Sequence, residues 1–185
     1  VDVKWPVEDK RQVLDDVTTT LEKEEHQNKI KLCLFSHITS IPSFILPIEE
    51  LVACVKSSDR NNQSYVMVDG AHAPGLIDIN LERIGCDYYT GNLHKWCFTP
   101  KGCAFLYTTR KQQEYNILQP TVIGATGEHT YVKRFAYTGT RDYTAFCTIP
   151  AAFHFAKKLG GFQAIAKYNH ELVIEAANHC ANLWG

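Results

Sequence analysis

The chain has 185 residues, of which 45% are hydrophobic and 21% are charged, and this composition is typical of a soluble globular protein. The formal net charge of −1 gives no electrostatic reason to expect binding to nucleic acid or to an anionic membrane surface. No stretch reaches the roughly 18 consecutive apolar residues that a membrane-spanning helix needs. We therefore expect neither nucleic acid nor a membrane as a partner.

The first predicted element is an amphipathic helix over residues 8–24, in which Val13, Val17 and Leu21 recur four residues apart. A second helix opens with a proline, Pro47, in its first turn. In chain order, the other expected elements are a strand at 29–35, the helix at 47–56, a strand at 65–68, a helix at 81–84, strands at 87–89 and 102–107, and helices at 143–158 and 161–183. This alternation of strands and helices predicts an α/β layered domain.

The seven cysteines predict reduced thiols. Their number is odd, no two of them form a Cys-x-x-Cys pair, and several sit in apolar runs, as Cys33 does. This pattern is typical of buried thiols in a cytoplasmic protein and not of a disulfide framework or a zinc site. We therefore predict a cytoplasmic location and no bound metal. The sequon Asn62-Gln63-Ser64 is short enough to occur by chance.

Polar or glycine-rich residues follow the carboxyl ends of the predicted strands. The segments concerned are Ser36–Ser40, Asp69–His72 and Thr90–Lys95. In α/β sheets, ligands bind at the edge that the carboxyl ends of the strands form. These three segments are therefore the predicted components of one binding site.

Each chemically suggestive residue has an ordinary structural explanation when it is taken alone. Asp69-Gly70 is a strong turn dipeptide, and His72 could be a packed, hydrogen-bonded histidine. Lys95 could be a surface lysine in a loop. However, it has the apolar neighbours Leu93 and Trp96, and desolvation favours the neutral amine that attacks an aldehyde.

The combination of Asp69 and Lys95 on successive strand ends favours a functional interpretation. Pyridoxal phosphate needs a lysine for its aldehyde, a carboxylate for its pyridine nitrogen and donors for its phosphate. Thr90, Asn92 and His94 are polar candidates beside the lysine. The sequence therefore predicts a site with the components that this cofactor requires.

Five motifs occur in an order that resembles a known family. They are Ser36–Ser40, Asp69-Gly70-Ala71-His72, Asn92-Leu93-His94-Lys95, Pro100-Lys101-Gly102 and Gly139-Thr140-Arg141-Asp142. The ordered set resembles the class V aminotransferase family of fold-type I pyridoxal-phosphate enzymes, in its isopenicillin N epimerase-like and cysteine desulfurase-like branch. An ordered set is far more specific than one motif. The resemblance implies a three-layer α/β large domain with a mainly parallel sheet, and pyridoxal 5'-phosphate as cofactor.

The resemblance also implies a role for individual residues. Lys95 would hold the cofactor as a Schiff base, and Asp69 would pair with the pyridinium nitrogen. His72, which stands where desulfurases carry glutamine, would approach the phenolic oxygen of the ring. Asn92 and His94 would bind the phosphate.

Two further cofactor-binding positions follow from the resemblance. Ser40 stands where many relatives have asparagine and would contact the ring. Thr140 looks like the residue that reaches the phosphate of the neighbouring subunit, which implies a homodimer with shared active sites. The alternative for Thr140 and Arg141 is a solvated turn without a ligand.

We expect the chain to be a piece of a longer protein, because it has no initiator methionine and members of the family are considerably longer. Residues 1–150 would form part of the cofactor-binding large domain, and residues 151–185 a helical connection towards a small domain. The first phosphate-binding loop and the arginine for the substrate carboxylate would lie outside the chain. Cys97, although close to Lys95, is interpreted as a buried structural thiol.

The resemblance implies an enzyme that acts on a small amino acid, with Lys95 as general base at the α-carbon. We predict a carbon–sulfur lyase of the cysteine desulfhydrase or desulfurase type. An epimerase of the isopenicillin N type or an aminotransferase is the alternative, and these motifs do not separate the three reactions. A non-catalytic alternative is an inactive, truncated binding or dimerisation fragment, although intact Asp69 and Lys95 argue against a long-decayed enzyme.

Overall fold

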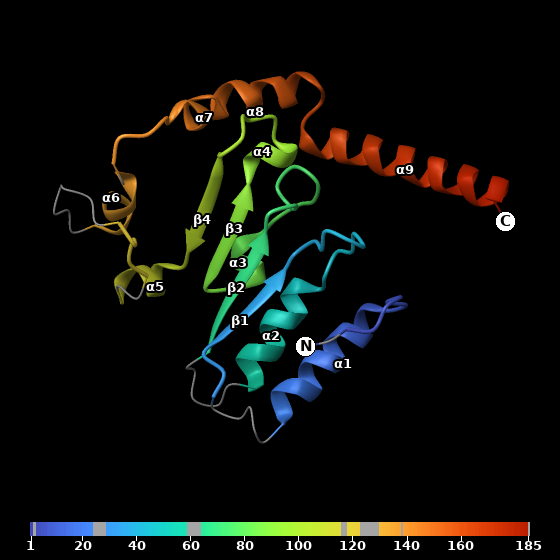
Figure 1. Ribbon diagram of the computed structural model, residues 1–185, viewed down its shortest axis with the longest axis horizontal. Coiled ribbons are helices and arrows are strands. Elements are labelled where there is room, and N and C mark those ends of the chain that lie inside the picture. Colours follow the sequence, from blue (N-terminus) through green and yellow to red (C-terminus); the bar gives the residue numbers. More distant parts are fainter. Residues whose placement is uncertain are drawn as a thin grey trace.

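The computed structural model describes residues 1, 3–23, 29–58, 64–115, 118–122, 130–137 and 139–184. This part of the chain contains a four-stranded sheet with the strand order β1–β2–β3–β4 (Figure 1). The strands β1, β2 and β3 run parallel to one another, whereas β4 is antiparallel to β3. The predicted α/β fold with a mainly parallel sheet is therefore confirmed. The strands are β1 (Leu32–Ser36), β2 (Tyr65–Gly70), β3 (Tyr88–Asn92) and β4 (Ala104–Thr108).

The predicted helices are all present, one of them divided in two, and three short helices at 93–96, 110–114 and 131–136 were not predicted. The helix predicted over 143–158 is split, because Pro150 lies in the first turn of its second part and has no N–H to donate to the preceding turn. Glu24 of the first predicted helix and Asn62 and Gln63 of the sequon lie outside the described residues. The helices are α1 (Lys10–Glu22), α2 (Ile48–Ser58), α3 (Leu81–Ile84), α4 (Leu93–Trp96), α5 (Arg110–Glu114), α6 (Tyr131–Ala136), α7 (Thr144–Cys147), α8 (Ile149–Lys158) and α9 (Phe162–Trp184).

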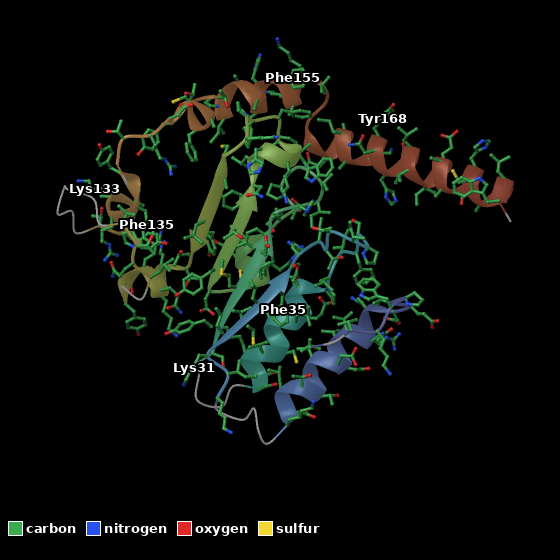
Figure 2. All side chains as sticks on the ribbon, in the orientation of Figure 1. Lys31, Phe35, Lys133, Phe135, Phe155 and Tyr168 are labelled. Carbon is green, nitrogen blue, oxygen red and sulfur yellow. The ribbon has the colours of Figure 1, made fainter. Side chains whose placement is uncertain are left out.

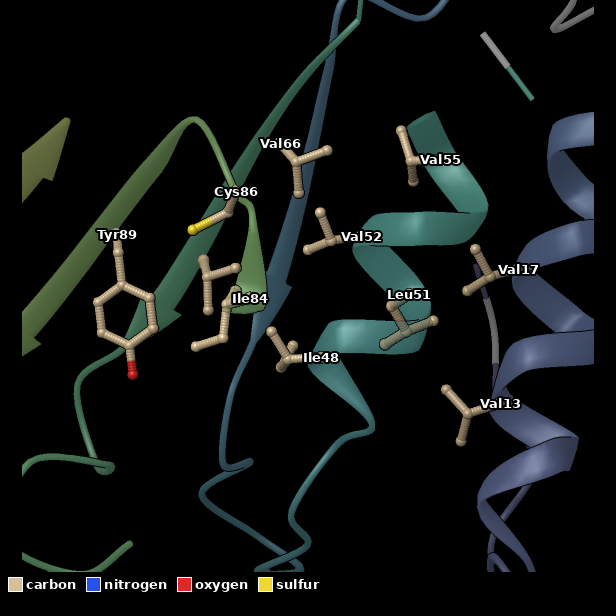
Figure 3. Packing of buried hydrophobic residues seen from close by; sticks show 11 residues of the cluster. Val13, Val17, Ile48, Leu51, Val52, Val55, Val66, Ile84, Cys86 and Tyr89 are labelled. Carbon is tan, nitrogen blue, oxygen red and sulfur yellow. The ribbon is translucent and has the colours of Figure 1, made fainter. Parts of the chain in front are cut away.

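The hydrophobic core lies between one face of the sheet and helix α2, and α1 packs on the outer side of α2 (Figure 3). Val66 and Val68 of β2 are fully buried, as is Leu51 of α2. Val13 and Val17, four residues apart on α1, complete the cluster, as expected for one face of a helix. The sheet, α2 and α1 therefore form successive layers, and they hold the strand ends in fixed positions.

The opposite face of the sheet is open in the described part of the chain. Alternate residues of β1 point to it, and Leu32 and Leu34 are 53% and 62% exposed there. Leu106 of β4 is also exposed. No helix among the described residues is long and apolar enough to span a membrane.

Helices α8 and α9 are joined to the sheet domain through an aromatic cluster around Phe98, the residue two positions after α4. The Phe98 ring lies 5.2 Å from that of Phe155 and 6.5 Å from that of Phe162, centroid to centroid. Beyond Phe162, α9 has no buried residue and extends away from the other elements (Figures 1 and 2). Tyr168 marks this exposed part of α9 in Figure 2.

All seven cysteines lie in the described part of the chain and are free thiols. Cys97 is buried, and burial raises the pKa of its thiol to about 11. A thiol with a raised pKa is a poor nucleophile at neutral pH. The structural interpretation of Cys97 is therefore supported by its surroundings.

The buried carboxylate of Asp87, the residue before β3, connects α2, β2 and α5. It accepts hydrogen bonds from Lys56 Nζ on α2 at 2.5 Å, from the Val66 N–H at 2.8 Å and from Gln112 Nε2 on α5 at 2.9 Å. Its side chain is 11% exposed and that of Lys56 is 31% exposed. Removing the carboxylate would take an acceptor from all three donors, of which Lys56 would keep the Ser64 carbonyl at 3.2 Å.

We expect Asp87→Ala to lower the free energy of unfolding by about 3 kcal/mol, the lower end of the cost of breaking a buried ion pair by removing one partner, because Lys56 is part-buried. Urea unfolding followed by circular dichroism measures this change. Asp15→Ala, which removes an exposed carboxylate of α1, is the matched control and should change stability by less than about 0.5 kcal/mol. Equal effects of the two substitutions would show that Asp87 does not hold these elements together.

Candidate cofactor site

The parallel register brings the ends of β1, β2 and β3 to one edge of the sheet. Asp69 pairs with Ser36 on one side and with Thr90 on the other. Helix α4 begins directly after β3, and the Cys103 carbonyl accepts hydrogen bonds from the N–H groups of Leu93 and His94 at 3.0 and 3.2 Å. Helix α4 therefore places Lys95 at the same edge of the sheet as Asp69.

Two predicted site residues, Lys95 and Ser40, lie close to the ring of a third, His72. The Nζ atom of Lys95 lies 3.1 Å from Nε2 of His72, and the Oγ atom of Ser40 lies 3.3 Å from the same nitrogen. These residues come from the segments after β3, β2 and β1, respectively. The sheet therefore brings together side chains that are 23 and 32 residues from His72 in sequence.

Asp69 lies within electrostatic range of this group. Burial is the main cause that lowers the pKa of His72, the charge of Lys95 lowers it further, and the carboxylate of Asp69 raises it. The Asp69 carboxylate is half-buried and accepts the Ala71 N–H at 2.9 Å through Oδ1. Among the described residues that is its one hydrogen bond, so its other oxygen can accept from a ligand.

The two predicted phosphate ligands also lie at the start of α4. Asn92 is the last residue of β3, and its side chain makes no capping hydrogen bond to the helix. His94 directs its Nδ1 atom to the Cys103 carbonyl at 2.9 Å. This contact fixes the orientation of the His94 ring and leaves Nε2 as the nitrogen that can meet a ligand.

Thr140 is not part of this group. Its hydroxyl is exposed and lies 3.4 Å from that of Tyr137, and no interaction among the described residues joins it to Ser40, His72 or Lys95. The structure therefore brings together Ser40, Asp69, His72 and Lys95 but leaves Thr140 apart.

The sequence analysis missed two buried residues next to Asp69, His37 and Tyr89, which are bonded to each other. His37 Nδ1 lies 2.8 Å from the hydroxyl of Tyr89, and the His37 N–H donates to the Asp69 carbonyl at 2.8 Å. A Cβ atom on Gly70 would lie 2.1 Å from that hydroxyl, so only glycine fits next to Asp69. Burial lowers the pKa of His37 and raises that of Tyr89, which keeps both side chains neutral near pH 7. The pairing of a histidine and a tyrosine 52 residues apart has no local sequence signal.

Comparison with known proteins identifies the class to which this fold and this site belong. The sequence profile of the family described as aminotransferase class-V matches residues 1–183. The chain belongs to the class V aminotransferase family. The pyridoxal-phosphate enzyme family expected from the ordered motifs is therefore confirmed.

Two curated relatives are similar over most of the chain. A probable L-cysteine desulfhydrase, chloroplastic, from Arabidopsis thaliana is 35% identical over 189 residues, which cover 100% of this chain and 39% of that protein. Isopenicillin N epimerase from Streptomyces clavuligerus is 34% identical over 148 residues, which cover 71% of this chain and 36% of that protein. The chain thus spans about two fifths of the length of such relatives.

Solved structures share the fold. An apo cysteine desulfurase from Thermococcus onnurineus NA1 superposes with a TM-score of 0.69 at 18% identity, covering 92% of this chain and 42% of that one. A variant of the protein C-DES with glycine covalently linked to its pyridoxal-phosphate cofactor has a TM-score of 0.62 at 26% identity, covering 74% of this chain and 38% of that one.

The residues present fit pyridoxal phosphate in their chemistry. Lys95 is exposed and ends in an amine. Asp69 has a carboxylate oxygen, Oδ2, that accepts no hydrogen bond from a described residue. His94 and Asn92 add polar groups at the start of α4. Amine, carboxylate and phosphate donors are the set that this cofactor requires.

Proposed function

We propose that this chain is the cofactor-binding part of a pyridoxal-phosphate enzyme that acts on a small amino acid. The observation that carries the proposal is the group formed by Lys95, His72 and Asp69 at the carboxyl edge of the sheet, with Lys95 Nζ 3.1 Å from His72 Nε2. The group lies at the edge where α/β sheets bind ligands, and this position favours a functional lysine over an ordinary surface lysine. The family membership adds independent support.

Each residue of the group has a defined task in this proposal. When bound, pyridoxal phosphate supplies an aldehyde for covalent attachment and a ring that accepts electrons from the α-carbon of the substrate. Lys95 would hold the cofactor through a covalent bond of its amine to the aldehyde, with loss of water, and would take the proton from the α-carbon. Asp69 keeps a proton on the ring nitrogen through a charge-assisted hydrogen bond.

The surrounding residues hold and orient the cofactor. His72 donates to the phenolic oxygen, and Ser40 contacts the ring from the neighbouring strand end. His94 and Asn92 bind the phosphate, with His94 oriented by its bond to the Cys103 carbonyl. Thr140, which makes no contact with its own chain's site among the described residues, reaches the phosphate of a second subunit. A homodimer with shared sites follows from this role.

The reaction that we propose is carbon–sulfur bond cleavage in cysteine or a related amino acid. The names of the relatives support this choice, because two Arabidopsis thaliana proteins named as L-cysteine desulfhydrases match the full length of the chain, whereas isopenicillin N epimerase from Streptomyces clavuligerus matches 71% of it. Epimerisation and transamination remain the alternative reactions, since Lys95 and Asp69 would serve all three. We also propose that the protein acts in the cytoplasm. Residues 1–150 would belong to the large domain, and residues 151–185 would lead to the small domain.

Product analysis of the protein, loaded with pyridoxal phosphate and supplied with L-cysteine, tests the proposed reaction. Sulfide released in step with cysteine loss is the expected result. Conversion of L-amino acids to their mirror images without sulfide would indicate an epimerase, and a keto acid formed only with an amino acceptor would indicate an aminotransferase. Failure to bind the cofactor at all would support the alternative of a non-catalytic fragment.

A further inference from the structure

Side chains from three segments, each of which follows a different strand, come together in the candidate cofactor site. Ser40 Oγ lies 3.3 Å from Nε2 of His72, and Lys95 Nζ lies 3.1 Å from the same nitrogen. The segments follow β1, β2 and β3, and β2 lies between the other two strands. The geometry of the site therefore depends on how the ends of these three strands are held relative to one another.

One buried hydroxyl group, that of Tyr89 on β3, lies at the base of all three segments. It is 2.8 Å from Nδ1 of His37, the residue that follows β1. It also lies against Gly70, the last residue of β2, because a Cβ atom at that position would overlap with it. Tyr89 is fully buried (Figure 3) and His37 is 8% exposed, and a hydrogen bond is stronger in such surroundings than in water. The bond thus joins β3 to the end of β1, two strands that are not neighbours in the sheet.

A closed hairpin connects His37 to Ser40. The His37 carbonyl accepts the Leu46 N–H at 2.9 Å, which closes the base of the hairpin. Nearer the tip, the Thr39 N–H donates to the Phe44 carbonyl at 3.0 Å. Because the hairpin is closed at both levels, a displacement of His37 would be passed on to Ser40.

Short connections also lead to the other two side chains. The Ala73 N–H donates to the Gly70 carbonyl at 2.9 Å and closes the turn that carries His72. Lys95 lies on α4, which begins directly after β3, the strand of Tyr89. A displacement at the Tyr89 hydroxyl would therefore reach His72 and Lys95 as well.

We propose that Tyr89 is a positioning residue, whose hydrogen bond to His37 holds three side chains of the site in contact. These side chains are Ser40, His72 and Lys95. Tyr89 acts through the strand ends and makes no bond to the cofactor. The consequence for pyridoxal phosphate binding rests on the proposed function, whereas the arrangement of the three side chains exists without the cofactor.

The titration of His72, followed by NMR in the absence of cofactor, tests this role. Burial and the charge of Lys95 lower the pKa of His72 from its ordinary value of 6.5. In Tyr89→Phe the strand ends lose their link, so His72 should be packed less closely and its pKa should rise towards that ordinary value. The affinity of the protein for pyridoxal phosphate should also fall about two- to tenfold, the effect of one hydrogen bond.

Two control variants separate positioning from a general loss of stability. Tyr88→Phe removes a hydroxyl from the neighbouring residue of β3, one that makes no hydrogen bond among the described residues. Val55→Ala truncates a fully buried side chain in the second half of α2 and should destabilise the fold at least as much as Tyr89→Phe. Neither control should change the His72 titration or the affinity for the cofactor.

The outcomes distinguish this role from the proposed function. An unchanged His72 titration in Tyr89→Phe, or an equal change in Val55→Ala, would overturn the positioning role. If the titration changes as expected but pyridoxal phosphate does not attach to Lys95 of the unmodified protein, the proposed function fails and the positioning role stands. If the cofactor attaches to Lys95 but the titration does not change, the positioning role fails and the proposed function stands.

Discussion

Lys95→Ala is expected to abolish covalent attachment of pyridoxal phosphate and to reduce turnover by at least about 10²–10⁴-fold, the contribution of a general base. The substitution removes both the amine that bonds to the aldehyde and the group that takes the α-proton. Absorption spectroscopy measures the first effect, because the visible band of the lysine-bound cofactor should be missing. Sulfide release from L-cysteine measures the second.

Lys111→Ala is the matched control for this experiment. It removes an exposed lysine of α5 and should leave both the visible band and the turnover unchanged. The role of Lys95 would be wrong if its alanine variant kept the band of a lysine-bound cofactor, since another amine would then be the attachment point.

Asp69→Asn is expected to separate cofactor attachment from turnover. The Lys95 amine is intact in this variant, so the protein should still become coloured with pyridoxal phosphate. Asparagine cannot hold the proton on the ring nitrogen through a charge-assisted bond, and that loss costs about 2–3 kcal/mol, or a roughly 30- to 160-fold lower rate. Absorption spectra and steady-state kinetics on the same sample measure the two effects.

Asp78→Asn provides the comparison, because Asp78 is an exposed carboxylate outside the group around His72. This control should retain the turnover of the unmodified protein. Full activity of Asp69→Asn would contradict the role assigned to Asp69, and complete loss of colour would indicate that Asp69 acts in binding and not in the chemical step.

The fold could be predicted where local patterns decide it. Apolar spacing predicted α1, and β-favouring runs bounded by polar residues predicted all four strands. The antiparallel direction of β4 was not predicted, although only residues 93–103 separate it from β3. A connection that short with one turn of helix favours an antiparallel return, since a parallel crossover needs a longer connection.

The site could be predicted only in part, because its members meet through the sheet. Asp69 and Lys95 were identified by chemistry and by their positions at strand ends, and the structure places both around His72. The contact of Ser40 with His72 and the His37–Tyr89 pair depend on tertiary packing. Such contacts leave no periodic signal along the chain. The role of Thr140 depends on a second subunit and stays a prediction.

The most direct test of the central claim is to identify the lysine that binds pyridoxal phosphate. The protein is incubated with the cofactor, the linkage is reduced with borohydride, and the digested protein is analysed by mass spectrometry. We predict one pyridoxyl group per chain, on the peptide that contains Lys95. Labelling at a different lysine, or equal labelling spread over the exposed lysines, would contradict the claim that Lys95 is the cofactor-binding residue.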